Sequence, residues 1–179
     1  MARLQNNRRL VLSALFLALG LLLPFLTAQI PEIGNMLLPM HIPVLLCGFA
    51  CGWQFGLIVG FITPLLRSIL FGMPPMMPIA VSMVFELAAY GAFAGLLIGL
   101  LKKDFKSVLV ALVGAMIIGR AVWGVASFIL FKLMGNPFTW EIFFAGAIVR
   151  AVPGIIAQII IIPAIMVAVW KVDERAHGG

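Results

Sequence analysis

Four charged side chains lie inside otherwise apolar stretches, and they are the residues most able to do chemistry. They are Arg67, Glu86, Arg120 and Arg150. A charge at the bilayer centre costs roughly 2.5–3.5 kcal/mol on insertion scales, so such residues usually face a polar interior. Glu86 and one arginine would together form a simple structural brace, but two arginines would then remain. Because guanidinium groups bind carboxylates with two parallel hydrogen bonds, we expect a cavity for an anionic or strongly hydrogen-bonding ligand.

Further polar residues follow these charges at helical spacing. Residues three or four apart share one face of a helix. Three such stripes are Ser82, Glu86 and Tyr90; Arg120, Trp123 and Ser127; and Arg150, Gly154 and Gln158. At a rise of 1.5 Å per residue, Glu86 and Arg150 lie roughly 12–14 Å from the starts of their helices. We therefore expect a pocket open to one side of the membrane, and the predicted ligand-binding residues are Arg67, Glu86, Tyr90, Arg120, Trp123, Ser127, Asn136, Arg150 and Gln158.

The composition places these residues in a membrane domain. Hydrophobic residues make up 64% of the 179 residues and charged residues 10%, whereas soluble domains have about 45–50% and about 25%. A helix of about 20 apolar residues crosses a bilayer. We predict an all-α integral membrane protein with a single domain over residues 1–179 and six transmembrane helices. The helices cover about residues 9–29, 41–53, 55–71, 79–101, 108–134 and 142–170.

The basic residues outside the helices predict the orientation in the membrane. They occur in the N-terminal segment, in the break after the fourth helix and in the C-terminal tail: Arg3, Arg8, Arg9, Lys102, Lys103, Lys106, Lys171 and Arg175. With six helices these segments share one side of the membrane. The breaks on the other side carry Glu32 and Glu141, with Lys132 at a helix end. The positive-inside rule then places both termini in the cytoplasm and opens the pocket to the outside.

Motifs for catalysis and for ATP hydrolysis are missing from the sequence. It contains no G-x-x-x-x-G-K-[ST] and no H-E-x-x-H. We predict that the protein is not an enzyme, has no cofactor and holds no metal. Cys47 and Cys51 lie four apart in an apolar run and are interpreted as packing residues. His41 lies near several methionines, and we interpret it as capping or orienting the second helix rather than as a metal ligand.

Three short segments resemble a known transporter family. The first helix contains an A-x-x-x-A pattern made by Ala14 and Ala18. The second helix begins with His41-Ile42-Pro43-Val44-Leu45-Leu46-Cys47-Gly48, and Gly56 and Gly60 follow at a spacing of four. With its size and basic ends, the chain resembles the substrate-binding S component of an energy-coupling factor (ECF) vitamin transporter, in the riboflavin/folate/pantothenate-type branch.

This resemblance implies partners and roles for further residues. Ala14 and Ala18 would dock on a transmembrane coupling protein, and two ATPase subunits would hydrolyse ATP. The loop from Pro31 to Met40, with Glu32, Asn35 and Met40, would form a lid over the pocket. The resemblance also implies a multi-pass protein of the bacterial cytoplasmic membrane, with no nucleic acid as partner.

The function implied is capture of a small water-soluble vitamin outside, followed by toppling of the subunit against the coupling protein. Nickel and cobalt relatives need a histidine directly after the first Met, and this chain has Ala2. The excess of arginine favours an anionic vitamin such as pantothenate or folate, while flavin, pyridoxal-type and cobamide precursors remain open. The alternative function is a stand-alone oligomeric channel or an ion-coupled secondary transporter.

Overall fold

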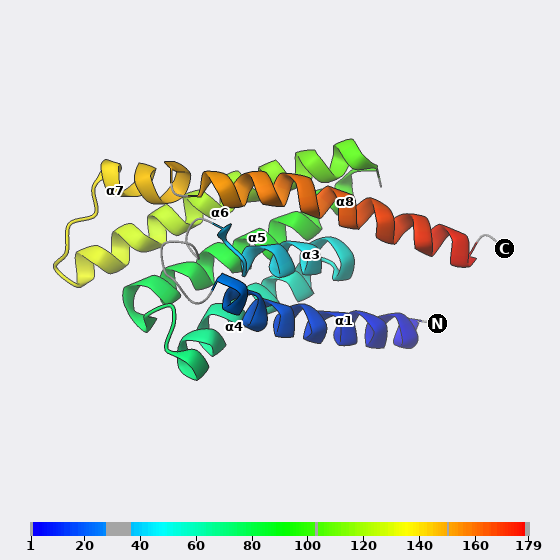
Figure 1. Cartoon of the computed structure of the whole chain (residues 1–179), viewed down its shortest axis with the longest axis horizontal. Helices are drawn as coiled ribbons and strands as arrows, with labels where there is room; N and C mark the ends of the chain where they lie inside the picture. Colours follow the sequence, from blue (N-terminus) through cyan, green and yellow to red (C-terminus); the bar gives the residue numbers. More distant parts are fainter. Residues whose placement is uncertain (1, 28–36, 103, 150, 178–179) are drawn as a thin grey trace.

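The computed structural model describes residues 2–27, 37–102, 104–149 and 151–177, and within these ranges the chain is helical with short connections (Figure 1). One 3-10 segment (η1) and two π-helical segments (η2 and η3) interrupt or extend the regular helices. The elements are α1 (Ala2–Leu22), η1 (Leu23–Thr27), α3 (His41–Cys51), α4 (Trp53–Phe71), η2 (Met76–Ala80), α5 (Val81–Leu100), α6 (Phe105–Leu133), α7 (Trp140–Phe144), η3 (Ala145–Val149) and α8 (Val152–His177).

Five helical segments of the described chain are long and apolar enough to cross a membrane. They are Asn6–Leu26, Trp53–Phe71, Met76–Leu100, Phe105–Leu133 and Val152–Val172. The second predicted helix is α3, which has 11 residues. At 1.5 Å per residue it spans about 16 Å, roughly half of the hydrocarbon core. Nine of its residues are buried, so α3 is an internal helix of the bundle.

The first and the last predicted helices are interrupted in the structure. The helix predicted over 9–29 begins at Ala2 and ends at Leu22, where the 3-10 turn η1 begins. Pro24 lies in that turn, and a proline has no N–H to continue the α-helical bonding. The helix predicted over 142–170 is divided into α7, the π turn η3 and α8. Pro153 is the second residue of α8, where a missing N–H is tolerated.

The helix predicted to begin at residue 108 begins at Phe105, because Asp104 caps it. The Asp104 carboxylate accepts a hydrogen bond of 2.8 Å from the Ser107 backbone N–H. Side-chain oxygens of this kind satisfy the free N–H groups of a first helical turn. The hydrogen bonding from Ser107 lowers the pKa of the Asp104 carboxyl below its usual value.

Glycines bring α3, α4 and α5 into direct backbone contact. A methyl group at Gly56 would clash with the carbonyl of Gly91, and one at Gly60 with the carbonyl of Leu87. Gly48 likewise faces Gly91. In lipid, small residues at four-residue spacing allow this close packing. These glycines are therefore internal packing positions of the bundle.

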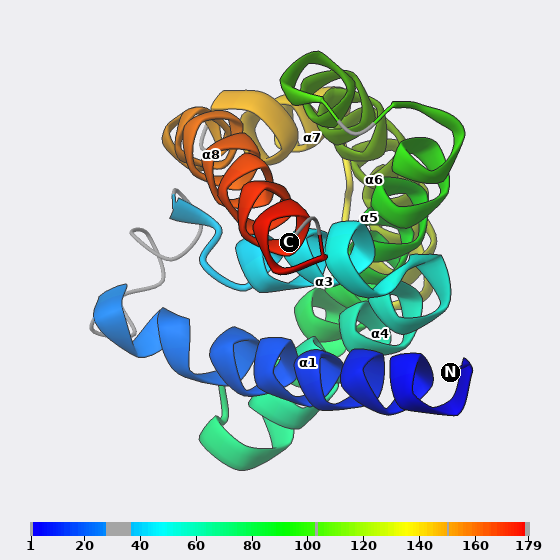
Figure 2. The same ribbon diagram turned by 90° about the vertical axis from the view of Figure 1, so that its right-hand side faces the viewer.

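Both ends of the chain lie at the same end of the bundle. Figure 1 places the beginning of α1 and the end of α8 there, together with the turn between α3 and α4 and the connection between α5 and α6. The connections between α4 and α5 and between α6 and α7 lie at the opposite end. The N-terminal segment, the connection between α5 and α6 and the C-terminal tail carry the basic residues named above. They share one end of the bundle, which we call the basic end (Figure 2).

Candidate functional site

A cavity of about 460 Å³ lies in the half of the bundle opposite to the basic end. Its walls come from the segment before α3, from η2, α5 and α6, and from α7 with η3. It contains residues from two of the predicted stripes, because α5 and α6 pack side by side. The polar or charged lining residues are His41, Ser82, Glu86, Arg120, Trp123, Ser127 and Glu141.

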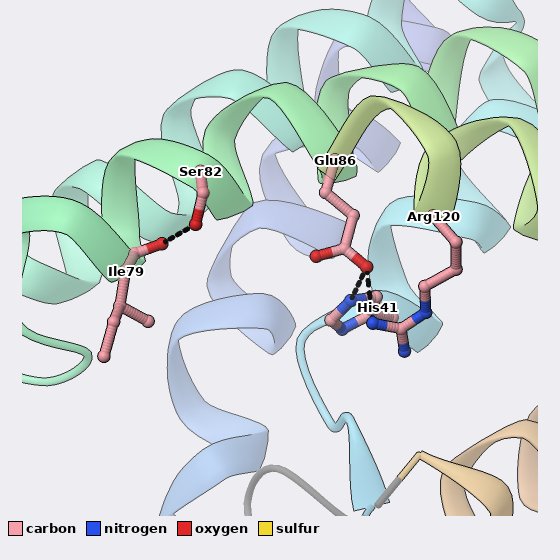
Figure 3. A network of polar contacts seen from close by, with 5 residues as sticks. All are labelled: His41, Ile79, Ser82, Glu86 and Arg120. Atoms are coloured by element: carbon pink, nitrogen blue, oxygen red, sulfur yellow. Dashed lines mark hydrogen bonds and ion pairs between the residues drawn. The ribbon is translucent and has the colours of Figure 1, made fainter. Parts of the chain in front are cut away.

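Glu86 is the centre of a buried ionic cluster (Figure 3). Its Oε1 atom lies 2.9 Å from Nη1 of Arg120 and 3.4 Å from Nε2 of His41. Glu86 is 2% exposed, His41 1% and Arg120 14%. Because Glu86 and Arg120 come from α5 and α6, the pair joins these helices at the cavity wall. One arginine is therefore neutralised by the glutamate.

The second edge of the Arg120 guanidinium has no partner in the described part of the chain. Its Nε and Nη2 atoms are buried and make no hydrogen bond there. These two N–H groups form the side of a guanidinium that binds a carboxylate with two parallel bonds. His41 Nδ1 and Ser127 Oγ are also buried without a partner among the described residues. Buried polar groups are normally hydrogen-bonded, so this set indicates a site for a polar ligand.

Aromatic side chains form another wall of the cavity. Trp123 lies 6.0 Å from Phe143 with an interplanar angle of 26°, and 6.0 Å from Phe138. Phe131 packs on Phe138 with their centroids 5.4 Å apart. The Trp123 ring fits here because Gly146 has no side chain. A methyl group at Gly146 would lie 2.8 Å from the indole ring. The cavity thus combines a polar cluster with an apolar wall, as ligand pockets usually do.

Besides Arg67, four predicted ligand-binding or lid residues lie outside the cavity lining. Tyr90 is buried one turn beyond Glu86, with its ring 5.3 Å from that of His41. Gln158 is buried on α8, and Asn136 is exposed in the connection between α6 and α7. Met40, predicted in the lid, is buried against the core that contains Val44. These positions share the predicted helical face or loop, but none of them lines the cavity.

The prediction that Arg67 joins the other charges is not met by the structure. Its Nη1 donates a hydrogen bond of 2.6 Å to the carbonyl oxygen of Leu21. Its guanidinium also lies 5.0 Å from the ring centre of Phe25 and 5.4 Å from that of Phe71. The last carbonyls of a helix lack partners within it, and Pro24 has no N–H to offer. Arg67 therefore satisfies the end of α1 instead of lining the cavity.

Three predicted residues, Arg150, Glu32 and Asn35, lie outside the described residues. Ala14 and Ala18 are both exposed on α1. Among the described residues, no group of three or more His, Cys, Asp and Glu side chains is placed to hold a metal ion.

His41 is the main site residue that the sequence reasoning missed. The sequence indicates that His41 caps or orients the second helix, yet its ring contacts Glu86 at the cavity. The sequence feature that could have revealed this role is a histidine at the start of an apolar helix that is too short to span a bilayer by itself. Neighbouring helices must bury such a helix, and its histidine is then buried with it.

The comparisons with known proteins identify the family. The family model for the ECF transporter, substrate-specific component, matches residues 8–169. No curated protein and no solved structure matches the chain. Because the family match covers most of the chain, the protein belongs to the substrate-specific components of ECF transporters, which are substrate-binding transport subunits and not enzymes.

Proposed function

We propose that the cavity around Arg120 captures a small water-soluble vitamin or vitamin precursor that carries a carboxylate or a similar planar acceptor. The observation that supports this is the free edge of Arg120, whose buried Nε and Nη2 atoms have no partner among the described residues. The aromatic wall around Trp123 suits a ring or another flat apolar part of the ligand. A folate-like molecule has both features, and a pantothenate-like molecule has the carboxylate together with a branched apolar group instead of a ring.

Among the residues that the structure describes, the cavity lacks the excess of positive charge that the sequence predicts. Arg67 lies elsewhere, and Arg120 has Glu86 as its counter-ion. The charged lining residues in the described part of the chain are Glu86, Arg120 and Glu141. Binding of a carboxylate therefore depends on the two directed hydrogen bonds of Arg120, with a further donor on Ser127, and not on an excess of positive charge. Such directed bonds select a planar group over a diffuse anion.

The proposed orientation has six passes of the chain between the two sides of the membrane, with α3 covering about half of one pass, and both termini in the cytoplasm of a bacterial cell. The basic end then faces the cytoplasm, as the positive-inside rule requires. The cavity lies in the other half of the bundle and receives its ligand from outside. The segment with Glu32, Asn35 and Met40 would close over it.

Delivery would follow by toppling of the subunit against a transmembrane coupling protein driven by two ATPase subunits. The chain itself would need no cofactor. Ala14 and Ala18 are exposed on α1, which suits a docking surface for the coupling protein. Substitution of both alanines by tryptophan should leave vitamin binding intact and abolish uptake by the complete transporter.

The test is identification of the bound molecule. Mass spectrometry of whatever co-purifies with the protein, followed by titration of tryptophan fluorescence against a vitamin panel, gives the ligand and its affinity. Arg120→Ala should weaken binding by more than about tenfold, roughly 1.4 kcal/mol. Lys106→Ala, an exposed position on the same helix, is the control. Unchanged affinity in Arg120→Ala, or solute flux through the purified chain alone in liposomes, would contradict the proposal.

A further inference from the structure

A second cavity, also of about 460 Å³, lies at the basic end and shares no lining residue with the first. It is formed by α1, α3, α5 and α8. α1 packs on α3 and α4, while α8 packs on α3 and α6. The cavity therefore lies beside α3, between α1 and α8, which both pack on α3. Figure 2 views this end of the bundle, with α1 and α8 on different sides of α3.

Glycines keep the space open. Gly48, Gly52, Gly95 and Gly99 all line the cavity. A Cβ atom at Gly52 or Gly99 would have no other atom within 4 Å. Gly52 also has a φ of +99°, which side chains rarely adopt, at the turn between α3 and α4. The turn thus contributes backbone without a side chain to the lining of the cavity.

The lining combines positive charge with apolar walls. Arg8 and Arg9 supply the charge, and no Asp or Glu is among the lining residues that the structure describes. Leu12, Phe49, Met166 and Trp170 are among the apolar lining residues. Trp170 suits the membrane interface, where its amphipathic ring is favoured. A cationic mouth above apolar walls matches an acidic lipid, whose phosphate and acyl chains need these two environments.

We propose that this cavity binds the phosphate of an acidic phospholipid of the cytoplasmic leaflet, with Arg9 and Arg8 at the phosphate and an acyl chain along Phe49 and Met166. A soluble phosphate would use the arginines but leave the apolar walls without a partner. An acidic side chain of a coupling protein would do the same. Basic pockets between helices on the cytoplasmic side are suited to anionic headgroups, and each arginine contributes to the attraction.

The experiment compares lipid retention by native mass spectrometry of the purified protein in phosphatidylglycerol and phosphatidylcholine mixtures. The protein should retain phosphatidylglycerol selectively. Arg9→Gln should lower that retention about fivefold, and Arg8→Gln with Arg9→Gln further. The control is Lys102→Gln with Lys106→Gln, which removes two exposed charges outside this cavity. Equal retention in the arginine variants and in this control would overturn the proposal.

Cys51 gives a second readout inside the cavity. It lines the cavity and is 1% exposed, whereas Cys47 lies outside the lining. In a Cys47→Ser background, N-ethylmaleimide should label Cys51 more slowly in nanodiscs that contain phosphatidylglycerol than in phosphatidylcholine alone. Equal protection by inorganic phosphate would show a soluble-anion site and overturn the lipid assignment. Protection by the coupling protein alone, without any effect of lipid, would overturn it in favour of a protein contact.

Discussion

The guanidinium of Arg67 donates a hydrogen bond of 2.6 Å to the carbonyl oxygen of Leu21 and thereby ties α4 to the last turn of α1. Arg67 is 3% exposed, and the rings of Phe25 and Phe71 lie on it. Those two rings also contact each other edge to face, with centroids 4.9 Å apart. An intramembrane arginine here has a structural partner and needs no ligand.

Arg67→Leu should therefore lower the stability of the fold and change ligand affinity less than Arg120→Ala does. The loss of a hydrogen bond from a charged donor is expected to cost about 1.5–3 kcal/mol. Thermal unfolding in detergent measures the stability, and fluorescence titration measures the affinity. Lys132→Ala, which removes an exposed cation near Phe128, provides the control. A tenfold loss of affinity with unchanged stability would instead place Arg67 at the ligand.

The pair of Glu86 and Arg120 allows stability to be separated from binding. Arg120→Gln leaves the buried Glu86 carboxylate without its cation, and breaking a buried pair in this way costs about 3–5 kcal/mol. The double variant Glu86→Gln with Arg120→Gln removes both charges and should recover much of that loss. It should not recover ligand binding, because the N–H groups of the Arg120 edge are gone.

A double-mutant cycle on unfolding temperature and on affinity checks this expectation. Recovery of both quantities in the double variant would mean that Arg120 acts on the fold alone. Failure to recover stability would mean that the two charges are not each other's main partners.

The site was predictable to the extent that it depends on spacing within one helix. Glu86 with Ser82 and Arg120 with Ser127 were found because the helical repeat fixes which residues share a face. The repeat does not fix which faces meet. Arg67, like Arg120, is an arginine in an apolar stretch of the sequence. Its position on α4, however, directs its side chain to the end of α1. His41 was missed because its position depends on α3 being buried in the bundle.

The fold, like the site, was predictable only in the features that depend on local sequence. Apolar length predicted the five long helices, since composition determines which segments cross a membrane. The π turn between α7 and α8 and the 3-10 turn after α1 depend on packing and on single prolines, so hydropathy did not reveal them. The capped start of α6 at Asp104 was visible in principle, because aspartate is a common N-cap residue.

Backbone contact between α4 and α5 predicts a sharp difference between two glycines. Gly91→Ala would place a methyl group against the backbone of Gly56 and should destabilise the protein by about 1–3 kcal/mol. Gly99→Ala lies on the same helix with open space around it and should be neutral or slightly stabilising. Thermal unfolding of the two variants in one detergent compares them directly. Equal loss in both would show that α4 and α5 do not pack closely through Gly91.

Gly146 offers a way to reshape the ligand cavity without changing its charges. It lies in η3, and an added Cβ would lie 2.8 Å from the outer edge of the Trp123 ring. Gly146→Val should displace Trp123 from its stack with Phe143, narrow the cavity and reduce vitamin affinity. The Arg120 edge remains, so a smaller carboxylate should lose less affinity than the full vitamin. Gly99→Ala serves again as the neutral control, and fluorescence titration with both ligands measures the difference. An equal loss for the two ligands would mean that Trp123 does not contact the apolar part of the vitamin, because the substitution would then act on the cavity as a whole.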